Sequence, residues 1–121
     1  MTNSKNIGNK GEELAAEYIV KKGYSLLARN WYYNHRELDI VARHNNDIVF
    51  IEVKTRAKDS LQLPSEAVTL KKQKLIIEAA HAYIIGHNIN LEARFDIIEV
   101  IHTFDGVEIE HIENAFYPRV S

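Results

Sequence analysis

Residues 36–56 read RELDIVARHNNDIVFIEVKTR, two runs rich in β-branched and aliphatic residues on either side of a polar centre. This pattern predicts two antiparallel strands, residues 37–43 and 48–55, joined by a tight turn. Asn45 and Asn46 lie at the centre, and asparagine tolerates the positive φ angles that tight hairpin turns require. A two-residue turn and a four-residue turn give the same register, so the pairing can be predicted without choosing between them.

In this register Asp39 lies opposite Glu52, and Glu37 lies opposite Lys54. Side chains alternate along a strand, so all four project from one face of the hairpin. Two carboxylates that face each other on paired strands repel by up to about 1 kcal/mol, and a bound cation would remove this repulsion. Because carboxylate oxygens and water are the ligands that Mg²⁺ prefers, the hairpin predicts a metal site at Asp39 and Glu52.

The other face of the hairpin is wholly apolar, so we expect it to pack against a helix. It carries Leu38, Ile40, Ala42, Val49, Ile51 and Val53. Nearer the turn, the charged face carries Val41 opposite Phe50. The acids are therefore expected at the edge of a hydrophobic core.

A divalent cation at this site could polarise a phosphate oxygen and lower the pKa of a bound water. Lys54 could orient or help deprotonate that water and stabilise charge in the transition state. Asp39, Glu52 and Lys54 are therefore candidate catalytic residues for phosphodiester hydrolysis. An alternative stays open, because Glu-x-Lys is common in strands and Glu37 and Lys54 could form an ordinary cross-strand ion pair.

The rest of the chain predicts helices and strands on both sides of this hairpin. Thr69 is a suitable N-cap for the second helix. The expected elements are helix 9–22, strand 24–33, the hairpin, a polar loop 59–65, helix 69–85, strand 91–100 and a short strand 107–112. This order predicts an α/β fold with a mixed central sheet flanked by helices.

The chain has 121 residues, which is the length of one domain, and we expect a single domain over residues 1–121. Its net charge of −2 argues against a protein that simply coats nucleic acid, because such proteins are usually basic. It has no cysteine, so disulfides and thiolate metal sites are excluded. No apolar run approaches the ~20 residues of a membrane span, and no signal peptide is visible, so we expect a cytoplasmic protein.

Five segments together resemble one known family. They are residues 8–15 (GNKGEELA), 28–31 (ARNW), 37–41 (ELDIV), 50–56 (FIEVKTR) and 94–97 (RFDI). The acid, strand pair and Glu-x-Lys resemble the PD-(D/E)xK nuclease superfamily, and the whole set resembles the UPF0102 (YraN-like) family. That family is similar to archaeal Holliday junction resolvases, and the resemblance covers nearly the whole chain.

The resemblance implies a restriction-endonuclease-like domain with an αβββαβ core and a site that uses Mg²⁺ or Mn²⁺. It adds Glu12, on the sheet-facing side of the first helix, to Asp39 and Glu52 as a metal ligand. One residue departs from the family pattern: Arg36 stands where the family usually has glycine. This change would alter the approach of a substrate backbone but removes no ligand.

Several other residues are candidates for contact with nucleic acid. Arg56 and Lys58 follow the site directly and are suited to phosphate contacts, and Lys72 and Gln73 lie at the start of the second helix. A solvated helix face explains the last two equally well. The aromatic residues 31–33 are more often core residues than base-stacking ones. We expect no role for the six histidines, and Asp96 is expected to pair with Arg94.

The sequence therefore predicts a metal-dependent endonuclease that acts on DNA, including branched DNA, as a homodimer. The dimer is an analogy with resolvases, which cut two strands symmetrically. The alternative is a non-catalytic nucleic-acid-binding or scaffold protein that keeps the nuclease fold, and a structural partner in a protein complex is a third. The acidic pI of about 6.3 favours the alternative slightly. The acid set opposes it, because clustered acids repel phosphate.

Overall fold

The computed structural model describes residues 4–59 and 68–118. The elements are α1 (Ser4–Lys21), β1 (Ser25–Tyr33), β2 (Arg36–His44), β3 (Asp47–Ala57), α2 (Leu70–Gly86), β4 (Glu92–Thr103) and β5 (Gly106–Phe116). This order confirms the predicted α/β class and the αβββαβ order of elements. The short last strand predicted over residues 107–112 is also present, as the longer β5. The predicted loop 59–65 lies outside the described residues from residue 60 onward.

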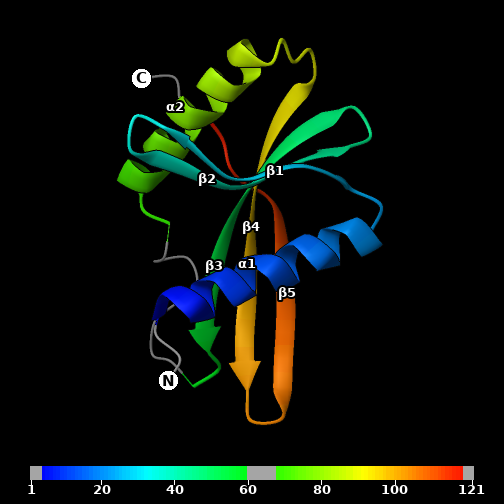
Figure 1. Ribbon diagram of the computed structural model, residues 1–121, viewed down its shortest axis with the longest axis vertical. Coiled ribbons are helices and arrows are strands. Elements are labelled where there is room, and N and C mark those ends of the chain that lie inside the picture. Colours follow the sequence, from blue (N-terminus) through cyan, green and yellow to red (C-terminus); the bar gives the residue numbers. More distant parts are fainter. Residues whose placement is uncertain (1–3, 60–67, 119–121) are drawn as a thin grey trace.

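The strands form one mixed sheet in the order β1-β2-β3-β4-β5. Neighbouring strands are antiparallel except β3 and β4, which are parallel. A parallel pair needs a long crossover connection, and α2 supplies it. In Figure 1, α1 crosses in front of β3, β4 and β5, while α2 lies at the upper left, near β2.

The predicted hairpin register is confirmed from the turn as far as Ile40. Ile40 pairs with Ile51, and the four pairs nearer the turn follow the same register. The turn is the two-residue alternative, because His44 pairs with Asp47. Asn45 has a φ of 54°, the left-handed conformation expected of asparagine in a tight turn.

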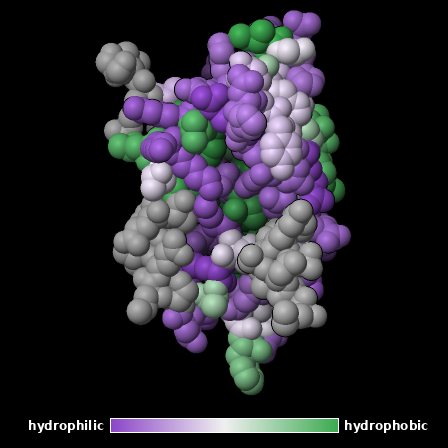
Figure 2. Space-filling model, turned by 60° about the vertical axis from the view of Figure 1, so that its left-hand side comes forward, coloured by the Kyte–Doolittle hydropathy of each residue, from purple (hydrophilic) through white to green (hydrophobic). Residues whose placement is uncertain are grey.

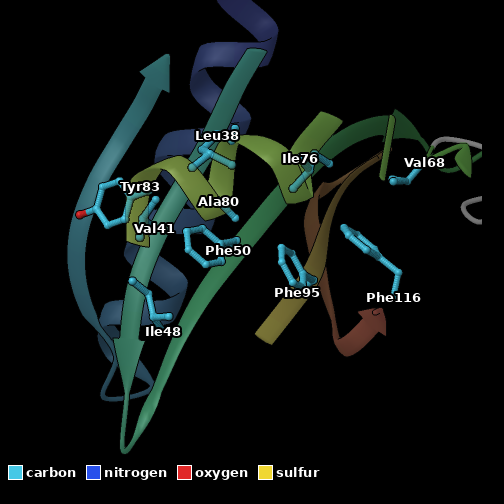
Figure 3. Close-up of a cluster of buried hydrophobic side chains, with 11 residues drawn as sticks. Leu38, Val41, Ile48, Phe50, Val68, Ile76, Ala80, Tyr83, Phe95 and Phe116 are labelled. Atoms are coloured by element: carbon cyan, nitrogen blue, oxygen red, sulfur yellow. The ribbon is translucent and has the colours of Figure 1, made fainter. Parts of the chain in front are cut away.

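Two hydrophobic cores lie on the two faces of the sheet. Under α1, Ala15 and Ile19 pack against Ile40, Val49 and Ile51, as predicted for the apolar face of the hairpin. Under α2 lies an aromatic-rich core in which the rings of Phe50, Phe95 and Phe116 form a row (Figure 3). The ring centroids along this row are 5.5 and 5.2 Å apart. The sheet is therefore covered on both faces.

One face assignment from the sequence is wrong. Leu38 lies in the α2 core with Val41, not in the α1 core with Ile40. Strict alternation would place residues 38 and 40 on the same face. In β1 the break occurs at Asn30, whose φ of 52° is left-handed, and the facing residue of β2 is Asp39. In both strands, therefore, the alternation of side chains between the two faces of the sheet is interrupted where Asn30 faces Asp39.

The predicted start of the first helix is wrong, whereas that of the second helix is confirmed. α1 begins at Ser4, five residues before the predicted start. The N-cap of α2 is confirmed, because Thr69 Oγ1 accepts the main-chain N–H of Lys72 at 3.2 Å.

None of the helices among the described residues is both long enough and apolar enough to cross a membrane.

A buried polar network ties β4 to β5. The fully buried carboxylate of Asp96 accepts two hydrogen bonds from Arg94, at 3.0 and 2.9 Å, as the predicted pairing requires. His111 Nε2 lies 2.7 Å from the same carboxylate, and Asn114 donates its main-chain N–H. Arg94 also donates to the hydroxyl of Tyr24. The expectation that no histidine has a role is therefore wrong for His111.

Candidate functional site

The site lies where β2 separates from β3. The ladder between these strands ends at Ile40–Ile51, so Asp39 and Glu52 do not pair directly across it as predicted. Instead, Asp39 Oδ2 accepts the main-chain N–H of Val53 at 2.9 Å. The Asp39 side chain thus satisfies a strand N–H that β2 no longer reaches.

Glu37 also differs from its predicted position. It pairs with Tyr32 of β1 and not with Lys54 of β3, because β2 stays with β1 after the two strands change face. Carboxylate oxygens of Glu12, Glu37 and Asp39 lie within 4.8 Å of one another. The predicted ligands Glu12 and Asp39 are therefore brought together, and the structure adds Glu37 to them.

Glu12 reaches this cluster because α1 lies very close to β3. A Cβ atom at Gly11 would collide with Thr55 Oγ1, so a larger residue here would force Thr55 or α1 to shift. From β1, the side-chain amide of Asn30 lies between two of the acids. With its nitrogen toward them, it donates to Glu37 Oε1 at 2.6 Å and to Glu12 Oε2 at 2.8 Å. Asn30 thus fixes the separation of Glu12 from Glu37.

Burial and like charge make the ionised acids unfavourable here. Burial, followed by repulsion from Glu52, raises the pKa of Asp39 to about 8. Burial, followed by repulsion from Glu37, raises the pKa of Glu12. Near neutral pH such a cluster needs either protons or a cation to balance its charge.

Glu52 is balanced by two lysines. Its side chain is only 6% exposed, and Oε1 lies 2.7 Å from Lys72 Nζ and 3.7 Å from Lys54 Nζ. Burial, followed by the neighbouring Lys72 ammonium, lowers the pKa of Lys54. Burial opposes the charge of Lys72, but its contact with Glu52 raises its pKa overall. Lys54, the lysine of the Glu-x-Lys motif, is thus joined at Glu52 by a second lysine from α2.

A cavity of about 160 Å³ connects these groups. Its walls include Glu37, Asp39, Glu52 and Lys72, together with His35, Arg36, Leu75 and Ile76. Arg36 of β2 reaches α2 and pairs with Glu78 at 2.8 Å. This contact links the start of β2 to α2 at the wall of the cavity.

The other residues predicted to contact nucleic acid do not gather around this cavity. Arg56 pairs with the buried Glu99 at 3.2 Å, and Lys58 pairs with Glu108 at 3.3 Å on the surface. Gln73 donates to the carbonyl of Val68 and lines a different pocket. On the face shown in Figure 2, hydrophilic side chains predominate and hydrophobic ones are scattered among them.

Sequence reasoning missed three features of the site. The sequence pattern gives Asn30 no role in the site, although a polar residue inside a largely apolar strand is a usable signal. It offers Glu37 only an alternative ion pair with Lys54, although Glu37 lies two residues from Asp39. It makes Lys72 a candidate phosphate contact, and no local pattern shows that Lys72 pairs with Glu52.

Comparison with known proteins agrees with the resemblance to the UPF0102 family over nearly the whole chain. Residues 11–100 match the model of an uncharacterised protein family, UPF0102. A UPF0102 protein of Parabacteroides distasonis is 44% identical over 97% of both chains. A UPF0102 protein of Phocaeicola vulgatus is 44% identical over 99% of both chains. One of Caldanaerobacter subterraneus is 44% identical over 94% of this chain and 97% of the relative. The chain belongs to the UPF0102 family.

Proposed function

We propose that this protein is a divalent-cation-dependent endonuclease that hydrolyses phosphodiester bonds in DNA. The observation that carries the proposal is the convergence of carboxylates and lysines at one place. Glu37, Asp39, Glu52 and Lys72 line one cavity. Glu12 clusters with Glu37 and Asp39, and Lys54 lies beside Glu52. The acids come from α1, β2 and β3, and the lysines come from β3 and α2. Structural ion pairs alone would not require so many like charges at one place.

The residues fit Mg²⁺ or Mn²⁺. Glu12, Glu37 and Asp39 offer oxygen donors within 4.8 Å of one another, and Glu52 borders Asp39 on the same cavity. Hard divalent cations prefer such ligands with water completing the shell. The cavity greatly exceeds the ~10–15 Å³ that one water needs. When bound, the cation would polarise a phosphate oxygen and lower the pKa of a water.

The protein's own residues supply the rest of the chemistry. A lysine whose pKa is lowered by burial and by a neighbouring ammonium is better able to accept a proton, so Lys54 is suited to orient and deprotonate the attacking water. As an ammonium it would instead stabilise negative charge on the transferred phosphoryl oxygens. Asp39 is held in place by the N–H of Val53, so its free oxygen can face the cavity.

The acids also argue against simple binding of nucleic acid. Without a cation, a cluster of carboxylates repels a phosphate backbone, and a pure binding protein gains nothing from it. With the cation, the same cluster attracts a phosphate. The net charge of −2 is compatible with an enzyme whose site must be acidic.

The test is incubation of the protein with linear, single-stranded and four-way-junction DNA in Mg²⁺ or Mn²⁺. We expect cleavage that disappears with EDTA and falls by at least about 100-fold in Asp39→Asn and Lys54→Ala. Lys71→Ala, an exposed lysine on α2, is the control and should retain activity. Cleavage that survives both substitutions would contradict the proposal. Metal-independent binding without cleavage would favour a non-catalytic nucleic-acid-binding protein.

We further propose that the protein acts as a homodimer, because symmetric cleavage of two strands needs two sites related by a two-fold axis. We also propose that it acts in the cytoplasm. Analytical ultracentrifugation with and without junction DNA tests this assembly. A single monomeric species in both samples would contradict it.

A further inference from the structure

The first turn of α2 carries charges that do not suit a helix N-terminus. Thr69 is the N-cap and Lys72 occupies the third helical position, where a capping box has glutamate or glutamine. The first turn contains no acid, and Lys71 and Lys74 are also nearby. The positive end of the helix dipole repels such lysines. A residue that breaks a local rule is expected to have a compensating partner elsewhere in the fold.

For Lys72 this partner is Glu52. Their 2.7 Å contact is shorter than the 3.7 Å separation of Lys54 from the same oxygen. Glu52 is 6% exposed, and an unpaired carboxylate at such a depth would be strongly unfavourable. The Lys72 side chain, in contrast, is 41% exposed. Its ammonium can therefore leave the pair without being buried.

We infer that Lys72 is an internal counter-ion that a divalent cation displaces from Glu52. This inference rests on the cation site proposed above. A cation bound to Glu52 and the Lys72 ammonium would compete for the same carboxylate, and two positive charges at contact distance repel each other. The long, flexible lysine stem allows the ammonium to turn into the cavity that it lines.

The exchange would give Lys72 two successive roles. Before the cation binds, it keeps the buried Glu52 neutralised and the site folded. Afterwards, its positive charge faces the cavity, where a substrate phosphate would bind. The charged groups facing Glu52 are Asp39, Lys54 and Lys72. Of the two lysines Lys72 is both the closer to Glu52 and the more exposed.

The first test measures Mn²⁺ binding to the full chain by calorimetry at fixed ionic strength. We expect Lys72→Met to bind Mn²⁺ at least about tenfold more tightly than the unmodified protein. Lys71→Met removes a neighbouring exposed charge and should change the affinity less than about threefold. Lys72→Arg keeps the positive charge and should bind Mn²⁺ as weakly as the unmodified protein. Equal affinity in Lys72→Met and the unmodified protein, or equal effects of Lys71→Met and Lys72→Met, would overturn the inference.

A second test observes the displacement itself. The Nζ resonance of Lys72, identified by its absence in Lys72→Met, is followed by NMR during titration with Mg²⁺. We expect it to shift or broaden as Mg²⁺ binds, while the resonance of Lys71 stays unchanged. An unchanged Lys72 resonance at saturating Mg²⁺ would overturn the inference. If Lys72→Met folds only when Mn²⁺ is present, this supports the inference, because the cation then replaces the missing ammonium.

These readouts separate the inference from the proposed function. Competition between Lys72 and the cation without any DNA cleavage would refute the nuclease but leave the counter-ion role standing. Cleavage with no effect of Lys72 on cation affinity would refute only the counter-ion role. If neither the unmodified protein nor Lys72→Met binds Mn²⁺ or Mg²⁺, the inference fails.

Discussion

The carboxylate of Asp39 accepts the main-chain N–H of Val53 at 2.9 Å, although the two residues belong to strands that are no longer paired at this level. One oxygen of Asp39 thus accepts a hydrogen bond from a β3 main-chain N–H that lies beyond the last main-chain pair between β2 and β3. This contact holds the end of the hairpin together while the strands separate. The space between them contains the candidate site.

The metal-free protein should lose stability as pH rises. The folded-state pKa of Asp39 is about 8 because of burial and repulsion from Glu52, whereas an unfolded aspartate has a pKa near 3.9. Between these values only the folded state keeps the proton, so unfolding becomes easier as pH rises through this range. We expect a loss of at least about 1 kcal/mol between pH 5 and pH 9 in urea unfolding with EDTA. Asp39→Asn should flatten this slope, leaving only the smaller part that comes from Glu12. Asp105→Asn, in the exposed β4–β5 turn, should keep the full slope. An unchanged slope in Asp39→Asn would contradict the assignment.

Glu37 should contribute to cation binding as much as the acids predicted from the sequence. Glu37→Gln removes one of three clustered carboxylates and should weaken Mn²⁺ binding at least about tenfold. Glu13→Gln, an exposed acid on α1 next to Glu12, is the matched control and should change the affinity by less than about twofold. Calorimetry on both variants distinguishes a specific ligand from a general loss of negative charge. Equal weakening in both would exclude Glu37 as a ligand.

Gly11 should resist a substitution that normally favours helices. Alanine in place of glycine within a helix usually stabilises by up to about 1 kcal/mol. At Gly11 the added methyl group would collide with Thr55, and such overpacking costs about 1–3 kcal/mol. Gly11→Ala should therefore lower the melting temperature and, by moving Glu12, weaken Mn²⁺ binding. Gly86→Ala, where nothing lies within 4 Å, should leave both unchanged or raise stability slightly; the same small effect in Gly11→Ala would show that α1 can move freely.

The Arg94–Asp96–His111 network should dominate stability at the far edge of the sheet. Burial alone would raise the pKa of Asp96, but His111 and Arg94 lower it below its ordinary value. Its stabilising effect is therefore complete above the unfolded pKa near 3.9 and is lost as pH falls below it. Asp96→Asn should destabilise by about 3–5 kcal/mol at pH 7, because it leaves Arg94 without its buried partner. Thermal unfolding beside Glu110→Gln, an exposed acid on β5, checks this; similar melting temperatures would contradict it.

The hairpin shows how far local pattern reaches. Its register follows from the symmetry of the two runs about Asn45 and Asn46, and the ladder obeys it from His44 back to Ile40. The pattern could not show that the ladder ends there. Strand alternation assumes regular backbone, and the left-handed φ of Asn30 on a different strand interrupts it. For this reason the pattern predicts the wrong positions for Leu38 and Glu37 and the correct ones for Ile40 and Ile51.

The sequence by itself determined the order of the elements, the hairpin register near its turn, and the candidate acids Asp39 and Glu52, while Glu12 was implied only by the family resemblance. These depend on periodicity and turn chemistry, which act over a few residues. Only the tertiary structure decided that Glu37 joins the acids and that Lys72 neutralises Glu52. Such contacts join residues on separate elements, and they exist because α1 and α2 pack on opposite faces of the sheet where β2 separates from β3.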